Sequence, residues 1–599
     1  MDHIKERREV PKEFQWNLER IFKTDEEFQK EIEAVRKQID EFAKLEGHTT
    51  ENAEMFYRSI TAGNEIERRL NKLYTYASMK SDEDVANTEN QAKKEQVVNL
   101  YNYASSKMYF QTPELLNTEK EVIESFYQAE PKLLEHKTNI EEVYRYKPHT
   151  LPKEEEKLLS NLSSAFGNDE TTYGYLTDSD LDFGTIHDEN GVEVPLTDTN
   201  FSIYIKSPKR EVRKEAFERL YEVYKQFQNT ITATFNGAIK QNVAMAHIKH
   251  YKTSFEAALF GDELDSKVYD TLVSSVRNHL DVLHDYYRLR KEVLNLKELH
   301  LYDVYTNLVP DTDTKYPFET ASRLVLDALK PLGDAYINDL KQAFTEGWID
   351  IYPNKNKRGG AYSSGSYDTM PYVLLNYQDK LDDVSTLAHE LGHSMHSFYT
   401  RKNQPYQYGD YPIFVAEVAS TVNELLLAKH TLKVSTNKNE RLAILNQLLE
   451  LFKGTIYRQV MFAEFEKYAY DLVEQDEVIT PDKLCKKYYE LNQDYFGSDV
   501  VVDKEIAYEW EKVPHFYYHF YVYKYATGIS AACHIVEGIL SGDEAKRASY
   551  LKMLANGCRE NPLNTLKIAG VDMTDKEVYE SAIRMFADTI EEFRNELKS

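Results

Sequence analysis

Over long parts of this chain, apolar residues recur at alternating steps of four and three, and this spacing limits the fold more than any other feature. One such run consists of Phe28, Ile32, Val35, Ile39 and Phe42. Residues spaced in this way share one face of an α-helix, and the polar residues between them form the solvated face. Successive runs between about residues 11 and 170 predict antiparallel helices. Only 22 of the 599 residues are glycine and helix-forming residues are abundant, so we expect a large, mainly α protein.

A different pattern interrupts the helices between about residues 181 and 205. There, Glu189-Asn190-Gly191 separates two short runs of β-prone residues, which is typical of a β-hairpin. A chain of this length can form several domains, or one helical body divided into lobes around a cleft. We predict a helical N-terminal lobe over residues 1–200 that ends in this hairpin, and a second region over residues 201–599.

Charge and cysteine content exclude several classes of function. The net charge of −27 argues against a nucleic-acid partner, because phosphate binding needs clustered Lys and Arg. The three cysteines, Cys485, Cys533 and Cys558, form no Cys-x-x-Cys pair, so neither a disulfide framework nor a thiolate zinc site is expected. Residues 1–8 lack the apolar segment of a secretion signal, and no apolar run is long enough to cross a bilayer. We predict a cytoplasmic protein without membrane association.

A His-Glu-x-x-His motif at residues 389–393 indicates a metal site. On a helix, His389 and His393 lie one turn apart on the same face, where both imidazoles can bind one Zn²⁺ ion and Glu390 can act as a general base. Asp382 or Asp383 is expected to cap the start of this helix. The alternative is a buried amphipathic helix whose histidines only satisfy hydrogen bonds. The residues around the motif bear on this choice.

The segment at residues 358–377 precedes the motif and joins a glycine-containing loop to a strand. It lacks the Lys-Ser/Thr ending of a phosphate-binding loop, so a nucleotide is not expected. Pro371 stands at the start of residues 372–377, a position that suits an edge strand. Such an edge can bind an extended peptide through main-chain hydrogen bonds. A purely structural loop and strand is the alternative.

A second helix, expected after Pro412, carries Glu417 among Val and Ala residues. A carboxylate in apolar surroundings must be paired, protonated or bound to a metal. Glu424, two turns later on the same face, is either a partner of a metal-bound histidine or an ordinary buried hydrogen-bonding residue. His396 shares the face of the motif histidines but lies a further turn along the helix, so we assign it a supporting role.

Residues 514–528 are rich in Tyr and His and predict a third helix, with His515, Tyr518, Val522 and Tyr525 in one stripe and Tyr521 on its border. The chain has 45 tyrosines, so a Tyr-rich core helix is one interpretation. The other is that Tyr and His donors face the zinc cleft and stabilise the oxyanion formed during peptide hydrolysis.

Together these motifs resemble the thimet-oligopeptidase-like family of zinc metallopeptidases, and most closely its oligopeptidase F branch. The similarity is carried by the loop at 359–368 and by residues 389–393, 414–420 and 514–528. It implies a two-lobed helical body with the zinc ion at the bottom of a deep channel and a small β element nearby. It also implies that residues 201–599 form the catalytic region.

The resemblance assigns zinc ligation to His389, His393 and Glu417 and the base to Glu390. As oxyanion donors we select His515, Tyr518 and Tyr521. We therefore expect an endopeptidase with one zinc ion per chain that hydrolyses short, unstructured peptides by a metal-activated water. The oligomeric state is not indicated. A catalytically idle helical protein that only binds peptides is the rival interpretation, and it would need a broken ligand set. None of the four central residues is missing.

Overall fold

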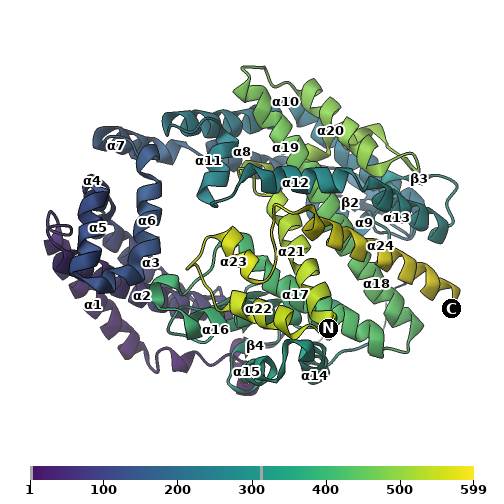
Figure 1. Cartoon of the computed structure of the whole chain (residues 1–599). Helices are drawn as coiled ribbons and strands as arrows, with labels where there is room; N and C mark the ends of the chain where they lie inside the picture. The colour runs from purple at the N-terminus through teal and green to yellow at the C-terminus, as the bar shows by residue number, and fades with distance from the viewer. Residues whose placement is uncertain (1–3, 311–313) are drawn as a thin grey trace. The chain divides into compact units, whose positions relative to one another are not determined.

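The computed structural model describes residues 4–310 and 314–599. Most of these residues are helical, and the strands are only two or three residues long (Figure 1). The predicted mainly α class is therefore confirmed. The chain divides into two compact units, each assembled from three stretches of sequence. The boundary expected near residue 200 and the deep channel between two lobes stay predictions.

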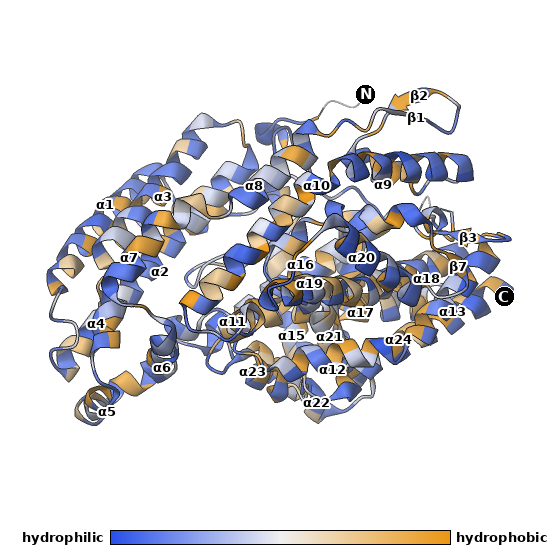
Figure 2. Ribbon diagram, turned by 90° about the horizontal axis from the view of Figure 1, so that it is seen from above, coloured by the Kyte–Doolittle hydropathy of each residue, from blue (hydrophilic) through white to orange (hydrophobic). Residues whose placement is uncertain are grey.

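Unit 1 comprises the described residues of Met1–Pro148, Thr314–His430 and Gly538–Gly570. The apolar stripe of α1 is buried against α2 and α3, as its spacing predicts, and hydrophobic and hydrophilic residues alternate along α1 (Figure 2). The helices of this unit are α1 (Asp25–Phe42), α2 (Ala53–Glu83), α3 (Thr88–Met108), α4 (Gln111–Asn117), α5 (Lys120–Ala129), α6 (Lys137–Arg145), α14 (Phe318–Ala328), α15 (Asp334–Thr345), α16 (Leu381–Asn403), the first part of α17 (Ile413–Val434), α22 (Glu544–Leu554) and α23 (Pro562–Ile568).

A three-stranded sheet packs beside α16 in unit 1. Its central strand, β6 (Tyr372–Leu374), runs parallel to β4 (Ile349–Asp350) and antiparallel to β5 (Tyr362–Ser364). The prediction of an edge strand at 372–377 is therefore wrong. Pro371 lies before the strand, so it removes no hydrogen-bond donor from the pairing of β6 with its neighbours. The side of β6 that was expected to be free pairs with β4, which is distant in the sequence. β4 and β5 are the two edge strands of this sheet, and no strand among the described residues pairs with the outer side of β5.

The motif helix α16 begins at Leu381, with Lys380 as its N-cap. The expectation that Asp382 or Asp383 is the N-cap residue is thus wrong. Asp383 lies in the first turn instead, and its side chain caps the N-terminus of α16 from there. Its carboxylate accepts hydrogen bonds from the backbone N–H groups of Gln378 (2.8 Å) and Lys380 (2.9 Å). An acidic side chain in the first turn can reach back to the chain before the helix in this way.

Unit 2 comprises the described residues of His149–Asp313, Thr431–Glu537 and Val571–Ser599. Its helices are α7 (Lys153–Leu162), α8 (Asn168–Tyr175), α9 (Asp198–Tyr204), α10 (Arg210–Ile248), α11 (Ser254–Gly261), α12 (Ser266–Arg277), α13 (Leu280–Val293), α18 (Lys438–Phe452), α19 (Arg458–Glu474), α20 (Pro481–Phe496), the first part of α21 (Tyr523–Leu540) and α24 (Lys576–Lys598).

Two small β elements belong to unit 2. Strands β1 (Thr185–His187) and β2 (Glu193–Pro195) form the antiparallel hairpin that the sequence predicts. Gly191 in its turn has a φ of 76°, a left-handed conformation that glycine adopts without steric cost. Strands β3 (Leu299–His300) and β7 (Val500–Val501) form a short parallel pair.

The continuous helix predicted over residues 514–528 is not formed. A 3₁₀ turn covers Pro514–Tyr517, and α21 begins only at Tyr523. Between them, His519 and Phe520 have φ values of 49° and 58°, which an α-helix does not allow. Tertiary hydrogen bonds stabilise this break: the backbone N–H of Phe520 donates to the buried Glu466 (2.6 Å), and the ring of His519 bonds the hydroxyl of Ser254 (2.8 Å).

Within residues 4–310 and 314–599, no helix combines the length and the apolar character that crossing a bilayer requires.

Candidate metal centre

Three candidate metal ligands from α16 and α17 come together in unit 1. The Nε2 atoms of His389 and His393 are 3.2 Å apart, and each lies 3.4 Å from Oε2 of Glu417. Zinc ligands bound at about 2.0–2.1 Å in a tetrahedron stand roughly 3.3 Å from one another. The three donor atoms thus form one face of a tetrahedron of the size that zinc requires. The donor set fits a zinc ion, and its two-nitrogen, one-carboxylate composition is that of a catalytic site with an open fourth position.

The packing of α17 on α16 places Glu417 at this group. The amide of Asn423 in α17 donates a hydrogen bond to the backbone carbonyl of Ala388 (3.0 Å), which links the two helices inside the core. The side chain of Glu417 is 51% exposed, so the expectation that its surroundings are apolar is wrong. Its neighbours Val415 and Val418 are fully buried. They point into the core, while Glu417 points toward the histidines.

A carboxylate holds the second ring nitrogen of His389. The Nδ1 atom of His389 lies 3.4 Å from Glu424, whose other oxygen accepts a hydrogen bond from Ser385 (3.3 Å). A carboxylate on the second nitrogen of a metal-binding histidine fixes the ring and raises its basicity. Burial alone would lower the pKa of His389, but its bonds with Glu417 and Glu424 raise the pKa to about 10.

The contact that raises the pKa of His389 lowers the pKa of Glu417. Its partial burial by itself favours the neutral form, yet hydrogen bonds with His389 and His393 hold the pKa of this carboxyl well below its usual range. The group therefore keeps a negative charge at neutral pH. In the metal-free protein, a proton on the imidazole of His389 balances that charge, and a cation that binds there replaces it.

Glu390 lies beside the three donors but takes no part in their contacts. Its side chain is buried, and burial raises its pKa against the opposing effect of the two histidines. The backbone N–H of Ser363 in β5 faces its carboxylate and opposes this rise in pKa, and the Ser363 hydroxyl lies 2.8 Å from that of Ser394 in α16. A carboxylate with a raised pKa, oriented by a backbone donor, suits general acid–base catalysis.

His396 is fully buried in the next turn of α16. Its ring stacks on Tyr411 with centroids 3.6 Å apart, and burial lowers its pKa to about 3. Tyr411 in turn bonds the hydroxyl of Ser397 (3.1 Å). A neutral imidazole that is buried and stacked in this way contributes to the packing of α16, in keeping with a supporting role.

The predicted oxyanion donors lie together in unit 2. The rings of His515 and Tyr521 stack with centroids 6.3 Å apart, and Tyr518 contacts both. The hydroxyl of Tyr525 bonds Nε2 of His515 (3.3 Å). Tyr518 is 47% exposed. These rings form one cluster although the helix expected to carry them is broken, and their role in catalysis stays a proposal.

Sequence reasoning missed the contact of Ser363 with Glu390. Ser363 belongs to the loop segment that was singled out, but nothing in its spacing indicates which residue it faces. The hydroxyl of Ser420, which donates to Oε2 of Glu417 (3.0 Å), could have been found, because residues three apart on a helix are neighbours.

Comparison with known proteins finds relatives along almost the whole chain. The profile of peptidase family M3 matches residues 203–585, and a profile described as oligopeptidase F matches residues 114–183. The chain is 43% identical to oligopeptidase PepF of Bacillus subtilis, over 99% of this chain and 88% of that protein. It is 39% identical to group B oligopeptidase PepB of Streptococcus agalactiae, over 98% of both chains. The crystal structure of oligoendopeptidase-F from Enterococcus faecium superposes with a TM-score of 0.73 at 32% identity, over 96% of this chain and 99% of that one.

Proposed function

Because this chain belongs to peptidase family M3 and is a metallopeptidase of oligopeptides, we propose that His389, His393 and Glu417 hold its one catalytic zinc ion and that Glu390 is the general base. The observation that carries this assignment is the triangle of donor atoms with sides of 3.2, 3.4 and 3.4 Å. Zinc bound there would polarise the scissile carbonyl and lower the pKa of the attacking water.

Glu390 performs the proton transfers. Its carboxylate takes a proton from the attacking water and delivers it to the nitrogen of the leaving amine. The backbone N–H of Ser363 faces the carboxylate and stabilises its charged form, and burial keeps bulk water from competing for the proton. Glu424 orients His389 through Nδ1, so the imidazole presents Nε2 to the metal.

The free edge of β5 is the proposed binding surface for the substrate backbone. In the middle strand, the N–H of Val373 donates to the carbonyl of Trp348, on the β4 side. Ser363 is opposite Val373 in the register, so its own backbone groups point away from β6. Its N–H faces Glu390, which leaves its carbonyl to accept a hydrogen bond from a substrate. An extended peptide can pair with this edge through its main chain, which favours acceptance of many unrelated sequences.

The cluster of His515, Tyr518 and Tyr521 supplies the proposed oxyanion donors. Short, unstructured peptides are the proposed substrates, because only an extended chain can offer its backbone to a strand edge. The absence of a nucleic-acid or membrane partner and a cytoplasmic location stay predictions from the sequence.

Metal analysis and a fluorogenic assay test this proposal together. The purified protein should carry one zinc per chain and cleave an internally quenched peptide. A chelator should abolish cleavage, and added zinc should restore it. Native proteins and long denatured chains such as casein should resist attack. A protein without zinc that binds peptides but cleaves none would support the rival peptide-binding scaffold, and rapid digestion of casein would contradict the limit on substrate size.

A further inference from the structure

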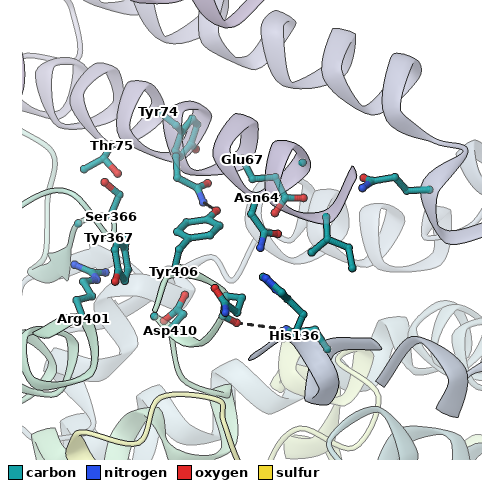
Figure 3. A pocket seen from close by; sticks show the side chains of 18 of the residues that line it. Asn64, Glu67, Tyr74, Thr75, His136, Ser366, Tyr367, Arg401, Tyr406 and Asp410 are labelled. Carbon is teal, nitrogen blue, oxygen red and sulfur yellow. Dashed lines mark hydrogen bonds between the residues drawn. The ribbon is translucent and has the colours of Figure 1, made fainter. Parts of the chain in front are cut away.

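A cavity in unit 1 and a break in the backbone of unit 2 are not accounted for by the three candidate ligands. The cavity has a volume of about 810 Å³, and Glu67 of α2 and Tyr406 are among the residues that line it (Figure 3). Ser363 of β5 lines it as well, so the cavity adjoins the proposed substrate edge and belongs to that site. The break at His519 and Phe520 has no such explanation.

The two residues at the break have a left-handed backbone conformation. Their φ values are 49° for His519 and 58° for Phe520, a region that residues with a Cβ atom seldom adopt and almost never in succession. Strained backbone persists only where the surrounding contacts hold it, and it gathers at functional sites. The contacts made by these two residues therefore bear on what the break is for.

Glu466 of α19 holds the second residue of the break. Its Oε1 atom accepts a hydrogen bond from the backbone N–H of Phe520 (2.6 Å). Glu466 is fully buried, and its Oε2 atom has no hydrogen-bond partner among the described residues. A buried carboxyl group with an unpaired oxygen lowers the stability of a fold. The one hydrogen bond that this carboxyl makes within the described part of the chain is thus directed at the break.

Ser254, the first residue of α11, holds the other residue of the break. Its hydroxyl lies 2.8 Å from Nε2 of His519. Burial lowers the pKa of His519 to about 4, so this contact is made by a neutral ring at pH 7. Ser254 is itself fixed, because its backbone N–H donates to Glu474 of α19 (2.6 Å), which contacts His247 of α10 (3.0 Å). Both residues of the break are therefore anchored to helices of unit 2.

The break separates a buried phenylalanine from two tyrosines that are partly exposed. The ring of Phe520 is buried against Phe255 and Tyr470, with centroids 4.9 and 4.4 Å away. On either side of the break, Tyr518 is exposed and Tyr521 is half-buried, and their rings are 6.3 Å apart. The conformation at the break therefore decides where the two proposed oxyanion donors lie.

We propose that Glu466 and Ser254 are positioning residues, which fix the hydroxyls of Tyr518 and Tyr521 by holding the break between them. The proposal rests on the role of these tyrosines as oxyanion donors in the proposed function. Such donors are effective because they are oriented before the reaction begins, and a displacement of about 1 Å can cost about 100-fold in rate. Anchors on both residues of the break supply this orientation.

The protonation of Glu466 suits this role and identifies a matched variant. Burial raises the pKa of Glu466 to about 8, so the carboxyl is largely neutral at pH 7. Lys524, whose charge favours the ionised form, is paired with Asp262 (2.5 Å). A neutral carboxyl accepts the bond from the Phe520 N–H without placing a negative charge beside the break. Glutamine has the same acceptor oxygen and nearly the same size, so Glu466→Gln should preserve the contact.

Steady-state kinetics of the zinc-loaded protein on a short quenched peptide test the proposal. Glu466→Leu removes the acceptor and should lower kcat about 10- to 100-fold with little change in KM, because the donors act in the transition state. Glu466→Gln should keep most of the wild-type kcat. Ser254→Ala, which removes only the contact with His519, should cause a smaller loss of the same kind. Val460→Ala is the control, since this buried residue lies about 120° from Glu466 around α19. It should lower the Tm and leave kcat unchanged.

A second substitution shows whether Glu466 acts through the tyrosine hydroxyls. In a Tyr518→Phe background, Glu466→Leu should lower kcat by a smaller factor than in the wild type, because one of the hydroxyls that it positions is absent. Equal factors in the two backgrounds would show that Glu466 acts elsewhere, and the proposal would be wrong. A Glu466→Gln variant as slow as Glu466→Leu would also contradict it. If Glu466→Leu does not fold, Ser254→Ala in the same two backgrounds makes the same test.

Hydrogen exchange measured by mass spectrometry reports on the break without turnover. The peptide that covers residues 515–523 should exchange faster in Glu466→Leu and at the wild-type rate in Glu466→Gln, while residues 381–403 should be unaffected. Unchanged exchange in Glu466→Leu would show that Glu466 does not hold the break. If Tyr518→Phe and Tyr521→Phe both keep the wild-type kcat, the positioning role falls with the oxyanion assignment, while zinc binding and peptide cleavage stand. If the zinc-loaded wild type cleaves no peptide, the proposed function itself has failed.

Discussion

Gly392 of α16 lies directly against the backbone of Ser420 in α17. A Cβ atom at position 392 would be 2.5 Å from the Cα atom of Ser420 and 2.6 Å from the carbonyl oxygen of Ala419. Backbone atoms inside two packed helices cannot move aside as the tip of a flexible side chain can. Because Gly392 adjoins His393 and Ser420 stands one turn after Glu417, this contact sets the separation of the candidate ligands from the two helices.

We expect Gly392→Ala to push α17 away from α16 and to enlarge the ligand triangle. Overpacking of this kind costs about 1–3 kcal/mol of stability, and a misplaced Glu417 should lower zinc affinity and activity further. Zinc titration and urea unfolding measure the two effects. Gly454→Ala is the control, since no atom lies within 4 Å of a Cβ at that position. Full zinc affinity in Gly392→Ala would show that the helix contact does not set the ligand geometry.

Glu417 and Glu424 should differ in what their loss does to the metal. Glu417→Ala removes a proposed ligand, so zinc should be nearly absent from the purified protein. Glu424→Gln removes only the carboxylate on Nδ1 of His389, and we expect zinc affinity to fall about 10- to 100-fold. Competition with a chromogenic chelator gives both affinities. Equal affinity in Glu417→Ala and the wild type would exclude Glu417 as a ligand.

Glu390→Gln should separate metal binding from catalysis. The substitution keeps the size of the side chain and does not touch the three donors, so zinc content should be unchanged. Turnover should fall by roughly two to four orders of magnitude, the contribution of a general acid–base group. Stopped assays on the zinc-loaded variant provide the rate. Near-normal turnover would remove Glu390 from the mechanism.

Tyr518→Phe and Tyr521→Phe test the proposed oxyanion donors. A donor that acts in the transition state lowers kcat when it is lost and changes KM little, with losses of about 10²–10³ for one donor. Steady-state kinetics on a short quenched peptide distinguish the two constants. Tyr489→Phe, which removes a hydroxyl that bonds the carbonyl of Val502 (3.1 Å), serves as control. Unchanged kcat in both variants would leave these tyrosines with a structural role.

Glu511 should make the stability of the protein depend on pH. Both of its carboxyl oxygens are buried without a hydrogen-bond partner among the described residues, and burial raises its pKa to about 9. The folded state therefore keeps a proton that the unfolded chain releases above about pH 4.3. The stability that Glu511 contributes is complete below that pH and is lost as pH rises toward 9, by at most about 1.4 kcal/mol per pH unit.

Replacement of Glu511 by Gln removes this titration. The stability of Glu511→Gln relative to the wild type should increase steadily between pH 5 and pH 9, as measured by urea unfolding at several pH values. Glu13→Gln, at an exposed position, should show no such trend. A difference between Glu511→Gln and the wild type that stays constant over this range would mean that Glu511 does not hold its proton in the folded state.

The chemistry of the candidate centre was accessible from the sequence because it is local. The four-residue spacing of His389 and His393 is a property of any helix, and the apolar runs that α1 buries are read directly from their period. Glu417 could be singled out as an unusual carboxylate, and its contact with the histidines agrees with the family resemblance, although the reason given, an apolar environment, was wrong.

Contacts between distant segments decided the rest. The central position of β6 depends on β4, and the break at His519 and Phe520 depends on Glu466 and Ser254, which no local propensity reveals. The contact of Ser363 with Glu390 likewise arises only when strand and helix pack together. The sequence determined which helices form and which residues carry the chemistry. Tertiary structure determined which strands of the sheet form its edges and where the third candidate ligand meets the two histidines, because pairing between remote segments satisfies some backbone and charged groups and leaves others open.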